Sequence, residues 1–166
     1  MALNQALLPE FDNEMATTRK LLERVPDAKL GWKPHDKSMS MSKLATHLAT
    51  IGGFVPAILG QDSFDVKNSP PNPDLSSHQE MLGTFDKRTA EARKLIADAT
   101  DDQLMKPWSL KFEGKTLFTS PRIAVLRSFF MNHSIHHRGQ LSVYLRLNNV
   151  AVPAMYGPSA DENPFG

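Results

Sequence analysis

The chain has 166 residues, of which 40% are hydrophobic and 22% are charged, and this composition is typical of one ordinary soluble globular domain. A formal net charge of +1 without a basic cluster argues against a nucleic-acid surface, and no apolar run is long enough to span a membrane. Because a signal peptide and cysteine are both absent, we expect a cytoplasmic protein in which nitrogen and oxygen atoms bind any metal.

Two helices are predicted in the N-terminal part of the chain. Residues 3–24 carry apolar side chains every three or four positions, which is the period of a helix with one buried face. The second helix is expected to begin at Ser40 or Ser42, because either hydroxyl can cap it. Gly52 and Gly53 predict a kink or a close backbone contact in its second half.

A third helix and a hairpin are predicted after a long polar connection. Ser77 and Glu80 fit a capping box, in which each side chain bonds the backbone N–H of the other residue, so the third helix should begin there. Residues 108–112 and 115–118 flank a turn and are typical of a short β-hairpin. Because an isolated hairpin is only marginally stable, we expect it to pack against the helices.

The fourth helix is predicted to be the longest, with Pro121 in its first turn and a pattern that continues to about residue 149. We expect Gly139 to allow close packing of a neighbouring helix. The tail, residues 150–166, contains three prolines and is expected to be irregular. The chain is therefore predicted to be all-α, a single domain over residues 1–166 that forms a four-helix bundle with a short hairpin before the last helix.

Three histidines on apolar helix faces are the candidate metal ligands. His133 and His137 are four residues apart, so both imidazoles lie on one face of the fourth helix. His47 lies on the apolar face of the second helix, and we expect these two helices to be diagonal and parallel, with the three rings at one height. Three imidazoles without a fourth protein ligand are typical of an open metal site, which leaves a position for water or substrate.

Other interpretations of the polar residues stay open. Each histidine ring can instead be neutral and hydrogen-bonded to a carbonyl or hydroxyl group, as buried polar groups usually are. His136 lies on the flank of the apolar face and can be a pocket residue. Gln140 and Tyr144 can orient a ligand, move a proton or simply pack in the core. Imidazole binds zinc, nickel, iron and copper, so the ligand type alone does not choose the metal.

Several motifs taken together resemble one known family. They are SKLATHL (42–48), NHSIHHRGQL (132–141), YLR (144–146), PAMYGPS (153–159) and WKP (32–34). With these motifs the sequence resembles the DinB-like (YfiT-like) metalloenzymes over essentially its whole length. Each motif is short and unspecific by itself, but their combination and order are specific.

The resemblance implies a fold, a metal and a range of reactions. The implied fold is a four-helix bundle in a mirror variant of the up-and-down arrangement. The implied metal is often nickel or zinc, held by three histidines that correspond to His47, His133 and His137. Members of the family often form homodimers. Related proteins transfer low-molecular-weight thiols such as bacillithiol, or isomerise a substrate with mycothiol, so a small-molecule substrate is expected.

Three functions are considered as hypotheses. The first is a metal-dependent transferase that activates a small thiol, with Arg138, Lys43 and Arg122 as candidates to bind the carboxylates of that thiol. The second is a metal-dependent hydrolase, which needs a carboxylate near the metal. Neither ligand-bearing helix face carries an acidic residue, and this favours transfer. The third is a non-catalytic protein that binds a metal or a small ligand.

Overall fold

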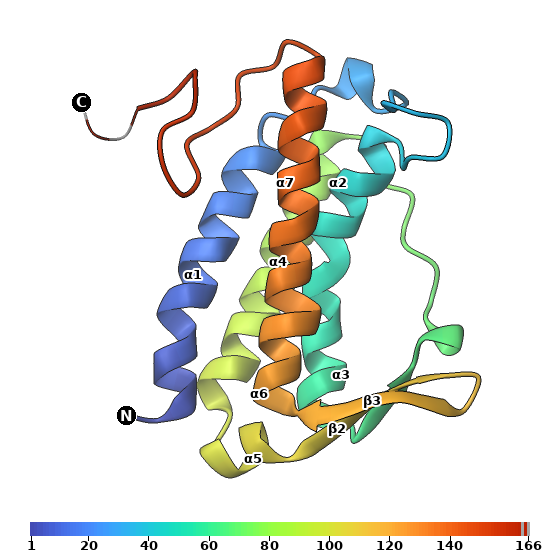
Figure 1. Cartoon of the computed structure of the whole chain (residues 1–166), viewed down its shortest axis with the longest axis vertical. Coiled ribbons are helices and arrows are strands. Elements are labelled where there is room, and N and C mark those ends of the chain that lie inside the picture. The colour runs from blue at the N-terminus through green and yellow to red at the C-terminus, as the bar shows by residue number, and fades with distance from the viewer. Residues whose placement is uncertain (164, 166) are drawn as a thin grey trace.

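Helices make up most of the computed structural model, which describes residues 1–163 and residue 165 (Figure 1). The α-helices are α1 (Leu3–Leu22), α2 (Met41–Thr50), α3 (Val55–Gly60), α4 (His78–Asp98), α5 (Asp101–Met105), α6 (Arg122–Val125) and α7 (Asn132–Leu147). The shorter helical elements are the 3-10 turns η1 (Asp27–Lys29), η2 (Ile51–Phe54) and η3 (Val66–Asn68), and the π-helical segment η4 (Leu126–Met131). The strands are β1 (Ser63–Asp65), β2 (Pro107–Phe112) and β3 (Lys115–Pro121).

The long helices pack side by side around one core, which includes the fully buried Phe11, Leu48, Met81 and Phe130. Helices α1 and α2 each contact both α4 and α7, so α2 and α7 are neighbours. Figure 1 shows α2 and α7 running in opposite directions. The expectation that these two helices are diagonal and parallel is therefore wrong. The connection between α3 and α4 returns along the length of the molecule, and this makes α4 run the same way as α2.

The last helical run extends from Arg122 to Leu147 through α6, η4 and α7, and it is the longest run in the described residues. The prediction of one long helix is confirmed in this form, but its beginning differs. Pro121 ends strand β3 and does not occupy the first helical turn. The π-helical segment η4 was not predicted from the sequence, and segments of this kind occur frequently at functional sites.

The predicted hairpin is present as β2 and β3, which pair in antiparallel orientation. Strand β1 pairs in parallel with β2, so the structure contains a three-stranded sheet where two strands were expected. The Asp65 carboxylate accepts hydrogen bonds from the backbone N–H groups of Glu113 (3.1 Å) and Gly114 (2.7 Å), which ties β1 to the hairpin turn. The fold is thus mostly helical with a small sheet. Strand β1 escaped prediction because it has only three residues and its partner is distant in sequence.

The two helix starts predicted from serine caps are confirmed. The hydroxyl of Ser40 accepts a hydrogen bond from the Lys43 N–H, and the hydroxyl of Ser77 accepts one from the Glu80 N–H. The other half of the capping box differs, because the Glu80 carboxylate accepts hydrogen bonds from Ser76. The kink predicted in the second helix is present, since η2 separates α2 from α3.

The tail forms neither helix nor strand over residues 150–163, as predicted. The rest of that prediction, at Pro164 and Gly166, lies outside the described residues. The Asp161 carboxylate pairs with Arg146 and accepts a hydrogen bond from the Val152 N–H, which holds the tail against the end of α7. Across residues 1–163 and residue 165, no helix combines the length and apolar character needed to cross a membrane.

Gly139 does not provide the close helix contact that was expected. A methyl group at this position would meet no atom of a neighbouring element within 4 Å, and the residue is exposed. Helices α2 and α1 contact other faces of α7, so this glycine lies on the outer surface.

We therefore expect Gly139→Ala to raise the free energy of unfolding by about 0.5–1 kcal/mol, because alanine loses less conformational freedom than glycine in a helix. Urea denaturation measures the change. The matched control is Gly114→Ala, which should destabilise because the hairpin turn needs a φ of +78° at this residue. If Gly139→Ala were less stable than the wild type, Gly139 would have the packing role that the sequence analysis predicted.

Candidate metal centre

The three predicted ligand histidines meet between α2 and α7. Nε2 of His47 lies 3.3 Å from Nε2 of His133, and Nε2 of His137 lies 2.8 Å from the same atom. His133 and His137 are one turn apart on α7, so they present two rings to the neighbouring helix, where His47 lies on the facing side of α2. The structure thus brings together all three residues that the sequence analysis selected.

Burial keeps these imidazoles neutral. Burial, followed by repulsion from the His137 and His133 rings, lowers the pKa of His47 from 6.5 to about 4. Burial is also the main reason why the pKa values of His133 and His137 lie below 6.5. The three rings are therefore uncharged near pH 7, which is the state that a metal ligand requires.

One hydrogen bond orients the His137 ring. Nδ1 of His137 lies 2.8 Å from Oε1 of Gln140, which can only accept, so Nδ1 donates and Nε2 keeps a free lone pair. That lone pair faces Nε2 of His133, 2.8 Å away. Either a proton on His133 Nε2 or a cation held by both nitrogen atoms satisfies this contact, and Nε2 of His47 lies 3.3 Å from the same His133 atom.

The spacing of the nitrogen atoms suits such a cation. Ligand nitrogens about 2.0–2.1 Å from a metal ion lie about 2.9–3.4 Å from one another, for angles between octahedral and tetrahedral. The measured separations of 3.3 and 2.8 Å lie in or next to this range, and all three ligand atoms fall within 4.8 Å of one another. The three-histidine group can therefore hold a metal ion.

The group leaves room for a further ligand. Among the described residues, no carboxylate joins the three histidines in a metal-binding arrangement. His47 and His133 are only half-buried, so the group is accessible to solvent. Structural zinc sites usually have four protein ligands, whereas sites that act on a substrate keep a position open.

The other candidate residues on α7 differ in their relation to the site. His136 is exposed at the rim, and its ring centroid lies 4.9 Å from that of His137. Gln140 orients His137 through the hydrogen bond described above. Tyr144 is farther away, donates its hydroxyl proton to the Met39 carbonyl and packs edge-on against Trp32. Its contacts are those of a packing residue.

Two of the three cations proposed to bind a thiol cofactor are engaged inside the protein. Arg138 is 1% exposed and pairs with Glu14, which is also buried. Arg122 is buried and donates to the backbone carbonyls of Leu59 and Gln61. The expectation that either arginine binds a cofactor is therefore wrong, because both guanidinium groups are buried and already bond to oxygen atoms of other elements. Lys43 is exposed one turn before His47 and stays a candidate.

Phe129 belongs to the site and was missed by the sequence analysis. The residue belongs to the π-helical segment η4, and its ring centroid lies 6.0 Å from that of His133. The available signal was its position four residues before His133, which is the same spacing that joins His133 to His137. Apolar side chains at this spacing are usually assigned to the core.

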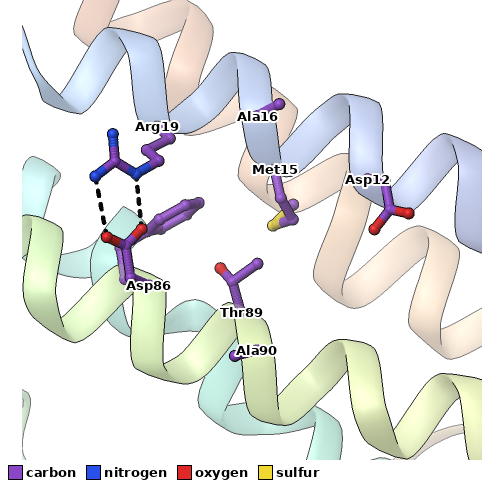
Figure 2. Close-up of a pocket in the computed structure, with 8 residues that line it drawn as sticks. Asp12, Met15, Ala16, Arg19, Asp86, Thr89 and Ala90 are labelled. Atoms are coloured by element: carbon purple, nitrogen blue, oxygen red, sulfur yellow. Dashed lines mark hydrogen bonds and ion pairs between the residues drawn. The ribbon is translucent and has the colours of Figure 1, made fainter.

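A surface pocket of about 250 Å³ lies elsewhere, between α1 and α4 (Figure 2). Met15 and Phe85 line it, and Arg19 donates to both carboxylate oxygens of Asp86 at 2.8 and 3.0 Å (Figure 2). None of its lining residues is a histidine, so this pocket is separate from the three-histidine group.

Comparison with known proteins places the chain in a family. The model of the DinB family matches residues 1–163. The chain belongs to the DinB family. This result confirms the resemblance seen in the sequence motifs, and the three-histidine group of this DinB-family protein is compatible with metal binding.

Relatives and solved structures agree with this assignment. The uncharacterized protein YrdA of Bacillus subtilis (strain 168) is 25% identical over 159 residues, which cover 93% of this chain and 89% of YrdA. YjoA of the same organism is 24% identical over 149 residues, which cover 88% of this chain and 91% of YjoA. A DinB-like protein from Bacillus cereus ATCC 10987 is 21% identical with a TM-score of 0.73, over 93% of this chain and 98% of that chain. The YjoA structure is 22% identical with a TM-score of 0.69, over 90% and 97%.

Replacing His47, His133 or His137 with Ala is expected to remove most of the bound metal from the purified protein, because the remaining two imidazoles hold an ion much less tightly. Inductively coupled plasma mass spectrometry measures the metal content. His136→Ala is the matched control and should keep its metal, because His136 is exposed and is not one of the three converging histidines. Full occupancy in His47→Ala would show that α2 supplies no ligand.

The metal-free protein should lose stability as the pH falls from 6.5 to about 4. In this window the unfolded chain protonates His47 and the folded chain does not, so the free energy of unfolding decreases with decreasing pH. Thermal melting at a series of pH values measures the loss. The same series on His47→Gln should show a smaller loss, whereas an identical loss would assign the whole effect to other groups.

Glu14→Ala should destabilise the protein by about 3–5 kcal/mol, because it leaves the buried Arg138 charge without its partner. Chemical denaturation measures the change. Asp12→Ala on the same helix is the matched control, since Asp12 pairs with Arg93 in an exposed ion pair and should contribute about 0–1 kcal/mol. Equal losses in the two variants would contradict the structural importance of the buried pair.

Proposed function

We propose that this chain is a metal-dependent enzyme that binds one divalent ion, nickel or zinc, through His47, His133 and His137 and acts on a small molecule. The observation that carries the proposal is the convergence of three imidazoles, with Nε2 of His47 and of His137 lying 3.3 and 2.8 Å from Nε2 of His133 and all three ligand atoms within 4.8 Å of one another. The accessible side of the group supports a role in chemistry beyond the fold.

The first candidate reaction is transfer of a small thiol to an electrophilic carbon. A divalent ion, when bound, supplies Lewis acidity, which lowers the pKa of a thiol or water molecule beside it. The thiol loses its proton, a sulfur–carbon bond forms, and the bond from that carbon to the leaving group breaks. In this reaction His136, exposed beside His137, would accept the proton, and the exposed Lys43 would pair with a carboxylate of the thiol.

The residues around the three histidines favour thiol transfer over hydrolysis. A hydrolytic site usually has a carboxylate that takes a proton from water, and no such group joins the histidines in the described residues. Gln140 is neutral and holds His137 by accepting a hydrogen bond from its Nδ1–H, so it is not a base. Hydrolysis and non-catalytic binding are therefore the alternatives that the experiment below must separate.

The experiment compares metal-loaded protein with its His47→Ala variant in two assays. The first follows conjugation of reduced low-molecular-weight thiols, bacillithiol among them, to a chromogenic electrophile. The second follows hydrolysis of activated esters. Thiol conjugation that disappears in the variant supports the proposal, ester hydrolysis alone supports the second hypothesis, and tight metal binding without either reaction supports the third.

Removal of the metal is expected to abolish any activity while leaving the helices intact. The core of α1, α2, α4 and α7 is large enough to fold alone, and the three ligands lie within helices. Binding to the folded state alone would stabilise it by roughly 2.7 kcal/mol when the metal is in hundredfold excess over its Kd. Circular dichroism and melting of chelated protein measure both effects. Loss of helices on chelation would mean that the site is structural.

Three finer points belong to the same proposal. The long helices are proposed to form a four-helix bundle of the mirror up-and-down type, because α1, α2, α4 and the last helical run share one core. The protein is proposed to be a homodimer, which analytical ultracentrifugation can test. A cytoplasmic location also stays a prediction.

A further inference from the structure

Four phenylalanine rings form one cluster beside the three-histidine group. They are Phe54, Phe64, Phe118 and Phe129, here called the aromatic wall. The ring centroid of Phe54 lies 5.7 Å from that of Phe64 and 5.3 Å from that of Phe129, and Phe118 lies 6.5 Å from Phe129. The cluster continues to the metal centre, because Phe129 lies 6.0 Å from His133.

The tertiary structure, not one local motif, builds the aromatic wall. Its four residues come from η2, β1, β3 and η4, and Figure 1 shows the sheet lying beside the start of the last helical run. The strand β1 that supplies Phe64 is the strand that the sequence analysis did not predict. The buried indole of Trp108 supports the wall from behind, 6.4 Å from both Phe118 and Phe129.

The wall differs from the aromatic core of the protein in its exposure. All four rings are half-buried, whereas Phe11 and Phe130 in the core are 0% exposed. Leaving large apolar rings partly in water gives up stabilisation that full burial would provide. The four rings also pack against the core, so each has one covered side and one partly accessible side. Apolar rings beside a few convergent polar groups are typical of the lining of small-molecule sites.

The backbone provides a second, independent indication. Phe129 lies in the π-helical segment Leu126–Met131, which directly precedes the helix that carries His133 and His137. A π-helical turn is rare and occurs frequently at functional sites. Here it presents Phe129 beside His133.

We propose that the aromatic wall binds an aromatic or similarly flat apolar group of the substrate, whose donor atom lies at the three histidines. This inference rests on the proposed function and adds the substrate class. The 6.0 Å between the Phe129 and His133 rings is a distance that one short linker spans in a single molecule. Offset or edge-to-face stacking on Phe54 and Phe129 would then orient the substrate ring.

The aromatic wall lies directly beside the three histidines, and for this reason we propose a small molecule as its ligand. A partner protein or a second copy of the chain would cover the rings without needing the adjoining imidazoles. A change of oligomeric state in the wall variants would therefore count against the proposal.

The test uses two probes with the same metal-binding group. Benzohydroxamic acid and acetohydroxamic acid differ in carrying a phenyl ring or a methyl group, and both are titrated by calorimetry into the zinc-loaded protein. We expect benzohydroxamic acid to bind at least about tenfold more tightly, because its ring is buried on the wall. In Phe54→Leu and in Phe129→Leu this ratio should fall to about threefold or less, with acetohydroxamic acid binding unchanged.

Phe112→Leu is the matched control, because Phe112 is an exposed phenylalanine on β2 outside the wall. This variant should keep the full ratio. A ratio near one in the wild type, or an unchanged ratio in both wall variants, would overturn the proposal.

Two further measurements separate the possible failures. The zinc content of the protein is measured first. A protein that holds no zinc would contradict the proposed metal-dependent function but would leave the proposal about the aromatic wall untouched. Benzyl alcohol, which does not chelate, is then titrated into metal-free wild type while the phenylalanine ring resonances are followed by NMR. Resonance shifts confined to the rings of the aromatic wall would support the inference, and the absence of such shifts would overturn it. Because this titration uses the wild-type protein, its result does not depend on the folding of any variant.

Discussion

The contact between His133 and His137 is the constraint on which the rest of the site depends. Their Nε2 atoms lie 2.8 Å apart, so the two rings must share either a proton or a bound cation. A third imidazole, that of His47, approaches the same point from the neighbouring helix. Burial then keeps the rings neutral, so an ion that enters does not have to displace protons near pH 7.

The surrounding structure holds α7 in the position that this contact requires. Arg138, the residue after His137, is buried against α1 and pairs with Glu14, while the Tyr156 hydroxyl links both groups to the tail. At the start of the helical run, Arg122 donates to the backbone carbonyls of Leu59, in α3, and of Gln61, just after it. The helical run is therefore tied to α3 at Arg122 and to α1 at Arg138, and His133 and His137 lie between these two anchors.

The site combines two kinds of surface. The histidines offer nitrogen ligands and an accessible position, and Gln140 fixes the orientation of one ring. Beside them lies an apolar surface that includes Phe54 and Phe129. Such a combination suits a molecule with one donor atom and one flat apolar group, whereas membership of the DinB family by itself assigns a fold and not a reaction.

The sequence alone determined the long helices, the serine caps, the hairpin and the three histidines that converge, because helical period and i, i+4 spacing are local properties. It did not determine that α2 and α7 are antiparallel neighbours, since this depends on the path of the connection before α4. It also misjudged Gly139 and Arg138, whose roles depend on whether another element covers that face of α7. Strand β1 and the aromatic wall appeared only in the tertiary structure, because parallel pairing and ring clusters join residues that are distant in sequence.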